Sequence, residues 1–221
     1  MSRLSRIMGV ALSCAALAAS AQLAPSKDMT LDEFRHYIDV LHIKEADERG
    51  VRVQMKAQAG QYPPWWPAQV TDSMIASMLQ VDFAALDYNY VKGCVSSQDL
   101  AVLTTVFATP EGQQYVAKMT GSMVEQEAKG VSPGDARDSA VDRDTGLPAG
   151  ALSKLTPAEK ERVKVLITGG AMDCMNSGYK KASVDITDAR TKAVKAVVAE
   201  HRGELIDAKT KYEAAHPASN K

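Results

Sequence analysis

Two cysteines, Cys94 and Cys174, are the residues whose type and spacing most clearly predict chemistry. Each ends a stripe of residues at helical spacing, which predicts that both thiols point into the protein. The stripes are Phe83, Leu86, Tyr90 and Cys94, and Val163, Ile167, Gly170 and Cys174. In an oxidising compartment the pair can close a loop of about 80 residues, which restricts the unfolded chain by roughly 4–5 kcal/mol. We therefore expect a disulfide; two buried free thiols are the alternative.

The N-terminal segment predicts such a compartment. Arg3 and Arg6 precede an uncharged, largely apolar run over residues 7–19, and Ala19-Ser20-Ala21 provides the small residues that signal peptidase requires. The run is too short to span a bilayer, which takes about 20 apolar residues. We expect a signal peptide over residues 1–21, cleavage after Ala21, and a periplasmic or secreted protein. Cys14, inside the signal, leaves a lipoprotein as an alternative.

Two Glu-x-x-His pairs and three methionine pairs have the spacing of metal ligands. Di-iron bundles use two Glu-x-x-His pairs because this spacing places both ligands on one helical face, and thioethers bind Cu(I). The pairs are Glu33 with His36, Glu213 with His216, Met74 with Met78, Met119 with Met123, and Met172 with Met175. One glutamate pair begins a helix, the other precedes Pro217, and the methionines accompany apolar stripes. We expect surface side chains and core packing, no metal site and no cofactor.

Two further patterns match known signatures only in part. Ser177 and Lys180 have the Ser-x-x-Lys spacing of penicillin-recognising acylases, but the Lys-Thr-Gly element of those enzymes is missing. Asp142 and Asp144 resemble the start of a calcium loop, but Ser153 stands where a bidentate Glu is required. We therefore expect a protein that is not an enzyme.

Trp65 and Trp66 lie in the segment 61–67, where three prolines prevent a helix. Rigid amphipathic aromatic side chains on such a turn can anchor a partner, a sugar chain or a lipid surface. They can equally fold back and close the end of a helical bundle. The sequence leaves both interpretations open.

The charge balance argues against nucleic acid as a partner. Removing residues 1–21 takes away two arginines and leaves 24 basic and 27 acidic residues, a net charge of −3. Binding to a phosphate backbone needs clustered lysines and arginines instead. After the signal, no segment is apolar enough to predict a transmembrane helix.

The elements that must position these residues are predicted to be helices throughout. Aromatic residues make up only 5% of the chain, and runs of β-branched residues are short. Capping signals mark helix starts at Thr30, Thr109 and Thr156. We expect one all-α domain over residues 22–221, a bundle of six to eight helices. They cover about residues 31–41, 44–59, 68–79, 82–94, 97–107, 110–130, 157–181 and 185–214.

The last third of the chain is predicted to hold a loop and a hairpin. Residues 131–155 are rich in Gly, Pro, Ser and Asp, which is typical of a long surface loop or an insertion. Residues 156–216 follow as a C-terminal helical hairpin. Its second helix carries a seam for packing along a neighbouring helix, made of Val194, Val198, His201, Leu205, Ala208 and Tyr212.

Three pieces from the middle of the chain form a recognisable pattern. They are Ser97-Gln98-Asp99-Leu100, then Leu103 and Phe107, and then Thr109-Pro110-Glu111-Gly112-Gln113. This pattern resembles the central signature of an exported bacterial family called domain of unknown function 2059, with Thr109 at a position where the family usually has Ser. The resemblance covers about residues 70–130. It implies an α-helical domain in the envelope of a Gram-negative bacterium, with structural roles for Leu100, Phe107, Thr109, Pro110 and Gly112, and it implies no catalytic residue.

Together these observations predict a non-catalytic interaction or structural protein of the bacterial envelope. Its partner would be an unknown envelope protein. A carrier that encloses a small apolar ligand or a lipid between Met-rich helices is the second hypothesis. A metal-binding helical bundle that uses the Glu-x-x-His pairs is the third.

Overall fold

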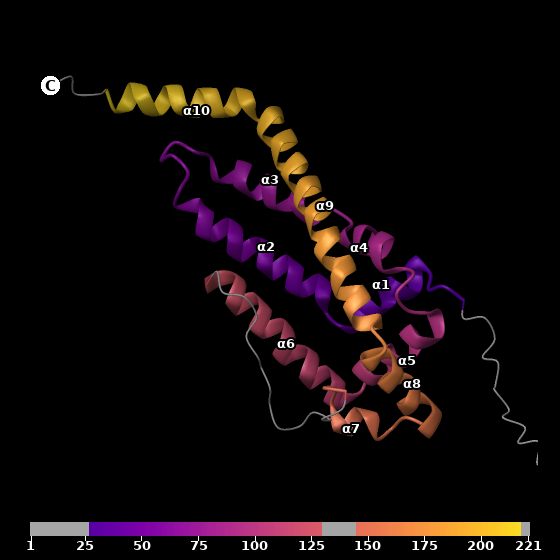
Figure 1. The fold of residues 1–221 in the computed structure, drawn as a ribbon. Helices are drawn as coiled ribbons and strands as arrows, with labels where there is room; N and C mark the ends of the chain where they lie inside the picture. Colours follow the sequence, from indigo (N-terminus) through magenta and orange to yellow (C-terminus); the bar gives the residue numbers. More distant parts are fainter. Residues whose placement is uncertain (1–26, 130–144, 218–221) are drawn as a thin grey trace, which may run out of the picture.

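The computed structural model describes residues 27–129 and 145–217, without the side chains of residues 122–129. The described residues form helices and no strand, so the predicted all-α fold is confirmed (Figure 1). The helices are α1 (Leu31–Val40), α2 (Ile43–Ala59), α3 (Ala68–Leu79), α4 (Phe83–Val91), α5 (Ser97–Phe107), α6 (Pro110–Lys129), α7 (Ala149–Leu152), α8 (Pro157–Thr168), α9 (Ala171–Glu200) and α10 (Arg202–Ala215). Within the described ranges, no helix combines the length and the apolar character that crossing a membrane requires.

Three of these helices begin with a capping box. The N-cap hydroxyl accepts a hydrogen bond from the backbone N–H three residues later, and the carboxylate at that later position accepts one from the N-cap N–H. The N-caps are Thr30, Ser96 and Thr156. The starts predicted at Thr30 and Thr156 are confirmed, because each depends on residues only three positions apart.

The C-terminal segment is divided differently from the prediction of two helices. The first break falls after Thr168, where Gly170 takes a φ of +84°, a left-handed conformation that glycine adopts without strain. α9 then continues without interruption to Glu200, and α10 follows after His201. The predicted pair of helices over residues 157–181 and 185–214 is therefore wrong, and three helices replace it.

The predicted loop at 131–155 also holds more structure than expected. Leu147, Ala151 and Leu155 are buried, and residues Ala149–Leu152 form the single turn of α7. Three apolar side chains spaced by four residues can cover a core even between glycines and prolines. Residues 130–144, with Asp142 and Asp144, lie outside the described part of the chain.

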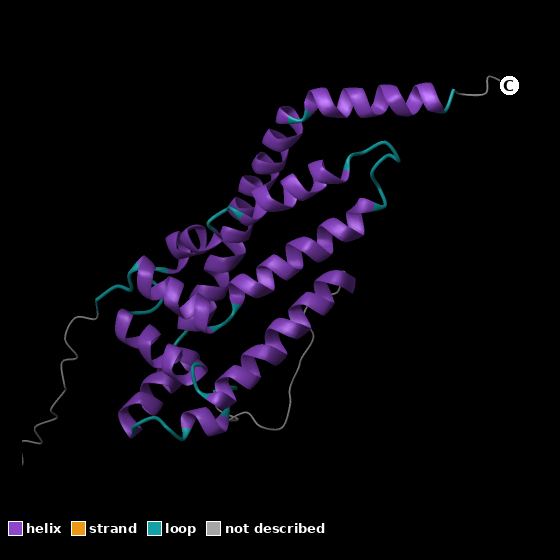
Figure 2. Ribbon diagram, turned by 180° about the vertical axis from the view of Figure 1, so that it is seen from behind, coloured by secondary structure: helices purple, strands orange, loops and turns teal. Residues whose placement is uncertain are grey.

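Two clusters of buried apolar side chains form the core, and α9 takes part in both. The first apolar cluster lies among α1, α4, α5, α6, α7, α8 and the beginning of α9. The second apolar cluster lies among α2, α3 and the later part of α9. It consists of Val51, Met55, Val70, Met74, Met78 and Val197. α10 has no buried side chain; its Leu205 packs against the second apolar cluster. The helix then extends away from the rest of the protein (Figure 2).

The two cysteines are paired at disulfide distance, as predicted. Their sulfur atoms lie 2.02 Å apart and join the end of α4 to the first turn of α9. The predicted inward stripe that ends at Cys94 is wrong by one residue, however, whereas in the other stripe Val163 is buried as predicted and Cys174 is not. The buried residues of α4 are Ala84, Asp87 and Val91, Tyr90 is 40% exposed, and Cys174 is exposed. The physical reason is that α4 packs closely on α9 at Gly178, where an added Cβ would lie 2.7 Å from Val91 Cγ1.

The turn between α5 and α6 joins the core to the start of α6. Leu100 and Phe107 are buried in the first apolar cluster. Thr109 Oγ1 accepts a hydrogen bond from the backbone N–H of Gly112 at 3.0 Å, and Pro110 is the first residue of α6. Leu100 and Phe107 thus pack the core beneath the turn, while Thr109 and Pro110 start α6.

Gln113, in the same turn, connects three helices. Its Nε2 donates hydrogen bonds to the carbonyl oxygens of Val40 and Phe107, at 2.9 and 2.8 Å. Its Oε1 lies 2.8 Å from Nε2 of His42, the residue between α1 and α2 with a φ of 51°. The ends of α1 and α5 are thereby tied to the start of α6.

Gly112→Ala is expected to lower the free energy of unfolding by more than about 2 kcal/mol. The added Cβ would lie 2.2 Å from the Val106 carbonyl oxygen, a backbone atom that cannot rotate away. Gly121→Ala in the same helix is the matched control, because nothing lies within 4 Å of its added Cβ. Helix propensity predicts that this control is unchanged or more stable by up to about 1 kcal/mol. Urea unfolding followed by circular dichroism measures both, and equal stabilities would contradict the close packing at Gly112.

Candidate functional site

A hollow of about 760 Å³ lies between α5 and α8 and is open to solvent. It is called the α5–α8 groove below. Its lining consists of Gln98, Asp99, Ala101, Val102, Thr105, Ala158, Glu159, Glu161, Arg162, Val165 and Leu166. Val102 and Leu166 are buried at its base, whereas Val165 is 57% exposed. Val165 therefore extends the apolar base of the groove to its rim.

The groove exists because α5 is apolar on two sides. Leu100, Leu103 and Phe107 face the first apolar cluster, while Val102 also lines the groove. α8 contributes Leu166 to the same cluster and Val165 to the rim, since neighbouring residues of a helix point about 100° apart. The base of the groove is therefore fixed by the core beneath it.

An ion pair joins the two walls. Arg162 Nη1 lies 2.8 Å from Asp99 Oδ1, and both side chains are 19% exposed. The other Asp99 oxygen, Oδ2, accepts a hydrogen bond from Ser96 Oγ at 2.6 Å within the capping box of α5. One carboxylate thus starts α5 and fixes α8 beside it, which sets the width of the groove.

The rim of the groove is acidic. Glu159 and Glu161 line it, and the charge of Arg162 is already used by Asp99. Hydrogen bonds from the Thr156 side chain and backbone hold the pKa of Glu159 below its usual range, so this carboxylate is ionised at neutral pH. The groove lining contains no His, Cys or Ser. On the other side of Glu161, a hollow of about 520 Å³ is lined by Lys160 and Lys164.

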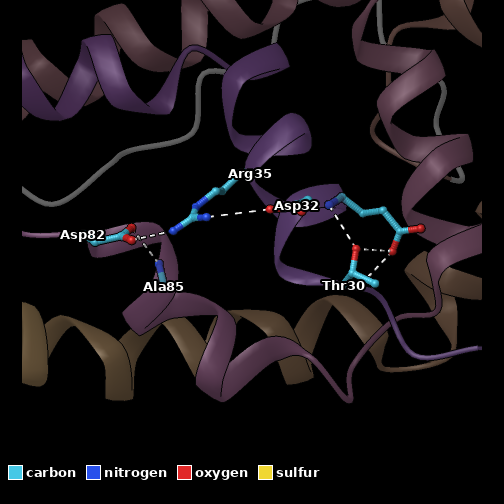
Figure 3. A network of polar contacts seen from close by, with 6 residues as sticks. Thr30, Asp32, Arg35, Asp82 and Ala85 are labelled. Carbon is cyan, nitrogen blue, oxygen red and sulfur yellow. Dashed lines mark hydrogen bonds and ion pairs between the residues drawn. The ribbon is translucent and has the colours of Figure 1, made fainter.

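A third, charged hollow of about 350 Å³ lies among α1, α2 and the turn between α3 and α4. Figure 3 shows how its arginine is held: Arg35 reaches Asp82 Oδ2 at 2.6 Å and Asp32 at 3.7 Å. Asp82 Oδ1 also accepts a hydrogen bond from the Ala85 N–H at 3.1 Å and so caps α4. Arg35 therefore ties α1 to the start of α4, and its contacts are accounted for by the fold.

Trp65 and Trp66 lie on the turn between α2 and α3. The Trp66 ring stacks on Tyr62 with centroids 4.9 Å apart, and its Nε1 donates a hydrogen bond to Thr71 Oγ1 at 3.1 Å. Trp66 packs against the second apolar cluster, which corresponds to the interpretation of a side chain that folds back. Trp65 is half-buried, and its ring centroid lies 6.1 Å from that of Trp66.

The two Glu-x-x-His pairs are far apart. Glu33 is engaged in the capping box of α1, and His216 stacks on Tyr212 at the end of α10, at the opposite end of the molecule (Figure 1). Among the described residues, no three side chains of His, Cys, Asp or Glu gather as a metal site would require. The structure does not bring the two pairs together as a di-iron bundle would.

The methionine pairs were all predicted to pack in the core, and the structure places only some of these side chains there. Met74 and Met78 lie in the second apolar cluster with Met55, and Met175 lies in the first. Met119 is 42% exposed, which contradicts its predicted place in the core, and Met123 lies outside the described side chains. At this level of α6 the buried residues are Val116 and Thr120, so the inward face is turned by one residue.

Sequence reasoning missed the groove and one buried acid. Val102 and Val165 look like ordinary core positions in the sequence, because nothing local shows which of two apolar faces stays open. Asp87, which is only 8% exposed, had a detectable signal: it is a lone acidic residue within the apolar stretch of α4.

No family model, curated protein or solved structure matches this chain. The resemblance to domain of unknown function 2059 therefore stays a prediction.

Replacing the two tryptophans separately tests which of them closes the second apolar cluster. Trp66→Ala is expected to lower the free energy of unfolding by about 2–3 kcal/mol, because it removes buried ring surface and the hydrogen bond to Thr71. Trp65→Ala, the matched control, is expected to cost less than about 1 kcal/mol. Urea unfolding followed by circular dichroism compares them. A Trp65 variant as unstable as the Trp66 variant would contradict this assignment.

Proposed function

We propose that this protein is a non-catalytic binding protein of the bacterial cell envelope, which holds an apolar helical segment of a partner in the α5–α8 groove. The observation that carries the proposal is the exposed Val165 beside the buried Val102 and Leu166. A groove between two helices fits the apolar face of a third helix. The acidic rim favours a partner helix with Lys or Arg beside its apolar face.

Support for the envelope comes from three independent features. They are the predicted signal peptide over residues 1–21, the pairing of Cys94 with Cys174, and the resemblance to an exported family. Recovery of a mature chain that begins at Gln22 from a Gram-negative periplasm would support export, and an uncleaved cytoplasmic chain would contradict it.

A carrier of a small apolar ligand remains the alternative, and it would use the same groove. The Met-rich helices give it less support, since Met55, Met74 and Met78 fill the second apolar cluster with their own side chains. Both functions would use the same apolar surface. Comparing the binding of a helical peptide and of a fatty acid to the same variants therefore separates the two functions.

Val165→Lys is expected to weaken binding of a fluorescent amphipathic leucine–lysine peptide roughly tenfold, because it places a cation in the groove. Val184→Lys is the matched control: Val184 is 59% exposed on α9 and lines none of the hollows described above. Both variants should fold, since both side chains already contact water. Fluorescence anisotropy of the exported chain measures the dissociation constants.

Three outcomes would contradict the proposal. They are equal effects of the two substitutions, a leucine–glutamate peptide that binds as well as the leucine–lysine peptide, and no peptide binding at all. Binding of palmitate, weakened by Val165→Lys, in the absence of peptide binding would favour the carrier instead.

A further inference from the structure

The α5–α8 groove has two unlike ends along α8. Glu159 and Glu161 line it near the start of this helix, and Val165 lines it near the end. A helix rises by about 1.5 Å per residue, so the two carboxylates and Val165 are separated by about 6 to 9 Å along the helix axis. The groove is therefore acidic at one end and apolar at the other.

The carboxylates at the acidic end form no ion pair with any described residue. Glu159 accepts hydrogen bonds from the Thr156 hydroxyl and backbone N–H, at 2.7 and 2.8 Å, and these donors carry no charge. Glu161 is exposed. Arg162, the one cation among the described lining residues, is held by Asp99 at 2.8 Å. Two negative charges therefore remain for a partner.

The lysines of α8 belong to a neighbouring surface. Lys160 and Lys164 line the hollow of about 520 Å³ on the other side of Glu161. They reduce the negative potential around Glu161, but neither of them lines the α5–α8 groove. The acidic end keeps its sign where a partner helix would lie.

The apolar end accepts a different kind of side chain. Val102 and Leu166 are both 7% exposed and belong to the first apolar cluster, and Val165 lies beside them at the rim. A lysine ammonium placed over these side chains loses water and gains no hydrogen bond from them. A leucine side chain buries apolar surface there instead. The two ends of the groove therefore select different residues of one partner.

The following inference rests on the proposed function. We propose that the groove binds a partner helix in one orientation, antiparallel to α8, and that the apolar and the basic residues of this partner lie in separate halves. Apolar side chains of its N-terminal half cover Val102, Val165 and Leu166. Lysines of its C-terminal half lie over Glu159 and Glu161, because the helix dipole stabilises cations at the C-terminal end of a helix.

Two helical peptides of one composition test this order of residues. In the segregated peptide, leucines occupy one face of the N-terminal half and lysines occupy the same face of the C-terminal half. In the mixed peptide, leucines and lysines alternate along that face. Fluorescence anisotropy with the exported chain is expected to show roughly tenfold tighter binding of the segregated peptide, because the mixed peptide brings a lysine to Val165.

A nitroxide label on the segregated peptide reports its direction. At the C-terminus of the peptide, the label should broaden the amide NMR signals of residues 158–161 more than those of residues 165–168. At the N-terminus of the peptide, it should broaden the signals of residues 165–168 more.

Glu161→Gln is expected to weaken binding of the segregated peptide roughly fivefold, because it removes one of the two charges at the acidic end. The matched control is Asp188→Asn, which removes an exposed carboxylate of α9 outside the groove and should leave binding unchanged. Equal effects of the two substitutions would overturn the placement of the lysines.

Equal affinities for the two peptides, or the reverse pattern of broadening, would overturn the orientation and leave the proposed function standing, because a peptide would still bind. Failure of both peptides to bind would contradict the proposed function, and the orientation with it. A dimer of the protein alone that Val165→Lys dissociates would assign the groove to a second copy of the chain, and would overturn the proposal as well.

Discussion

The close contact between α4 and α9 is the constraint on which the arrangement of the other helices depends. Gly178 lets Val91 approach the α9 backbone, where any side chain would collide, and the Cys94–Cys174 disulfide closes the adjacent end of the contact. Because α9 continues as one helix to Glu200, the same contact also directs the part of α9 that packs on α3 in the second apolar cluster. One rigid helix thus positions two cores that share few side chains.

The α5–α8 groove depends on the first of these cores. Its base is formed by Val102 and Leu166, which also belong to the first apolar cluster, and its walls are joined by Asp99 and Arg162. A partner would therefore meet a surface that is already ordered, which lowers the entropy lost on binding.

Local signals in the sequence predicted the helix starts, the all-α class and the turn at Thr109, because capping depends on residues a few positions apart. Which face of a helix is buried is harder to predict from sequence. The stripe that ends at Cys94 lies one residue away from the face of α4 that packs on α9. Only the contact at Gly178 selects that face, and it joins residues distant in sequence. The disulfide could be predicted because only two cysteines follow the predicted signal peptide, whereas the groove and the buried Asp87 depend on which apolar faces remain uncovered after packing.

The claim that α9 makes one cooperative unit of both cores has a direct test, because the chain contains two tryptophans and both lie beside the second apolar cluster. Tryptophan fluorescence therefore reports on that cluster, while far-UV circular dichroism reports on all helices. In urea unfolding the two transitions are expected to coincide. Separate midpoints, with the fluorescence change first, would contradict the account.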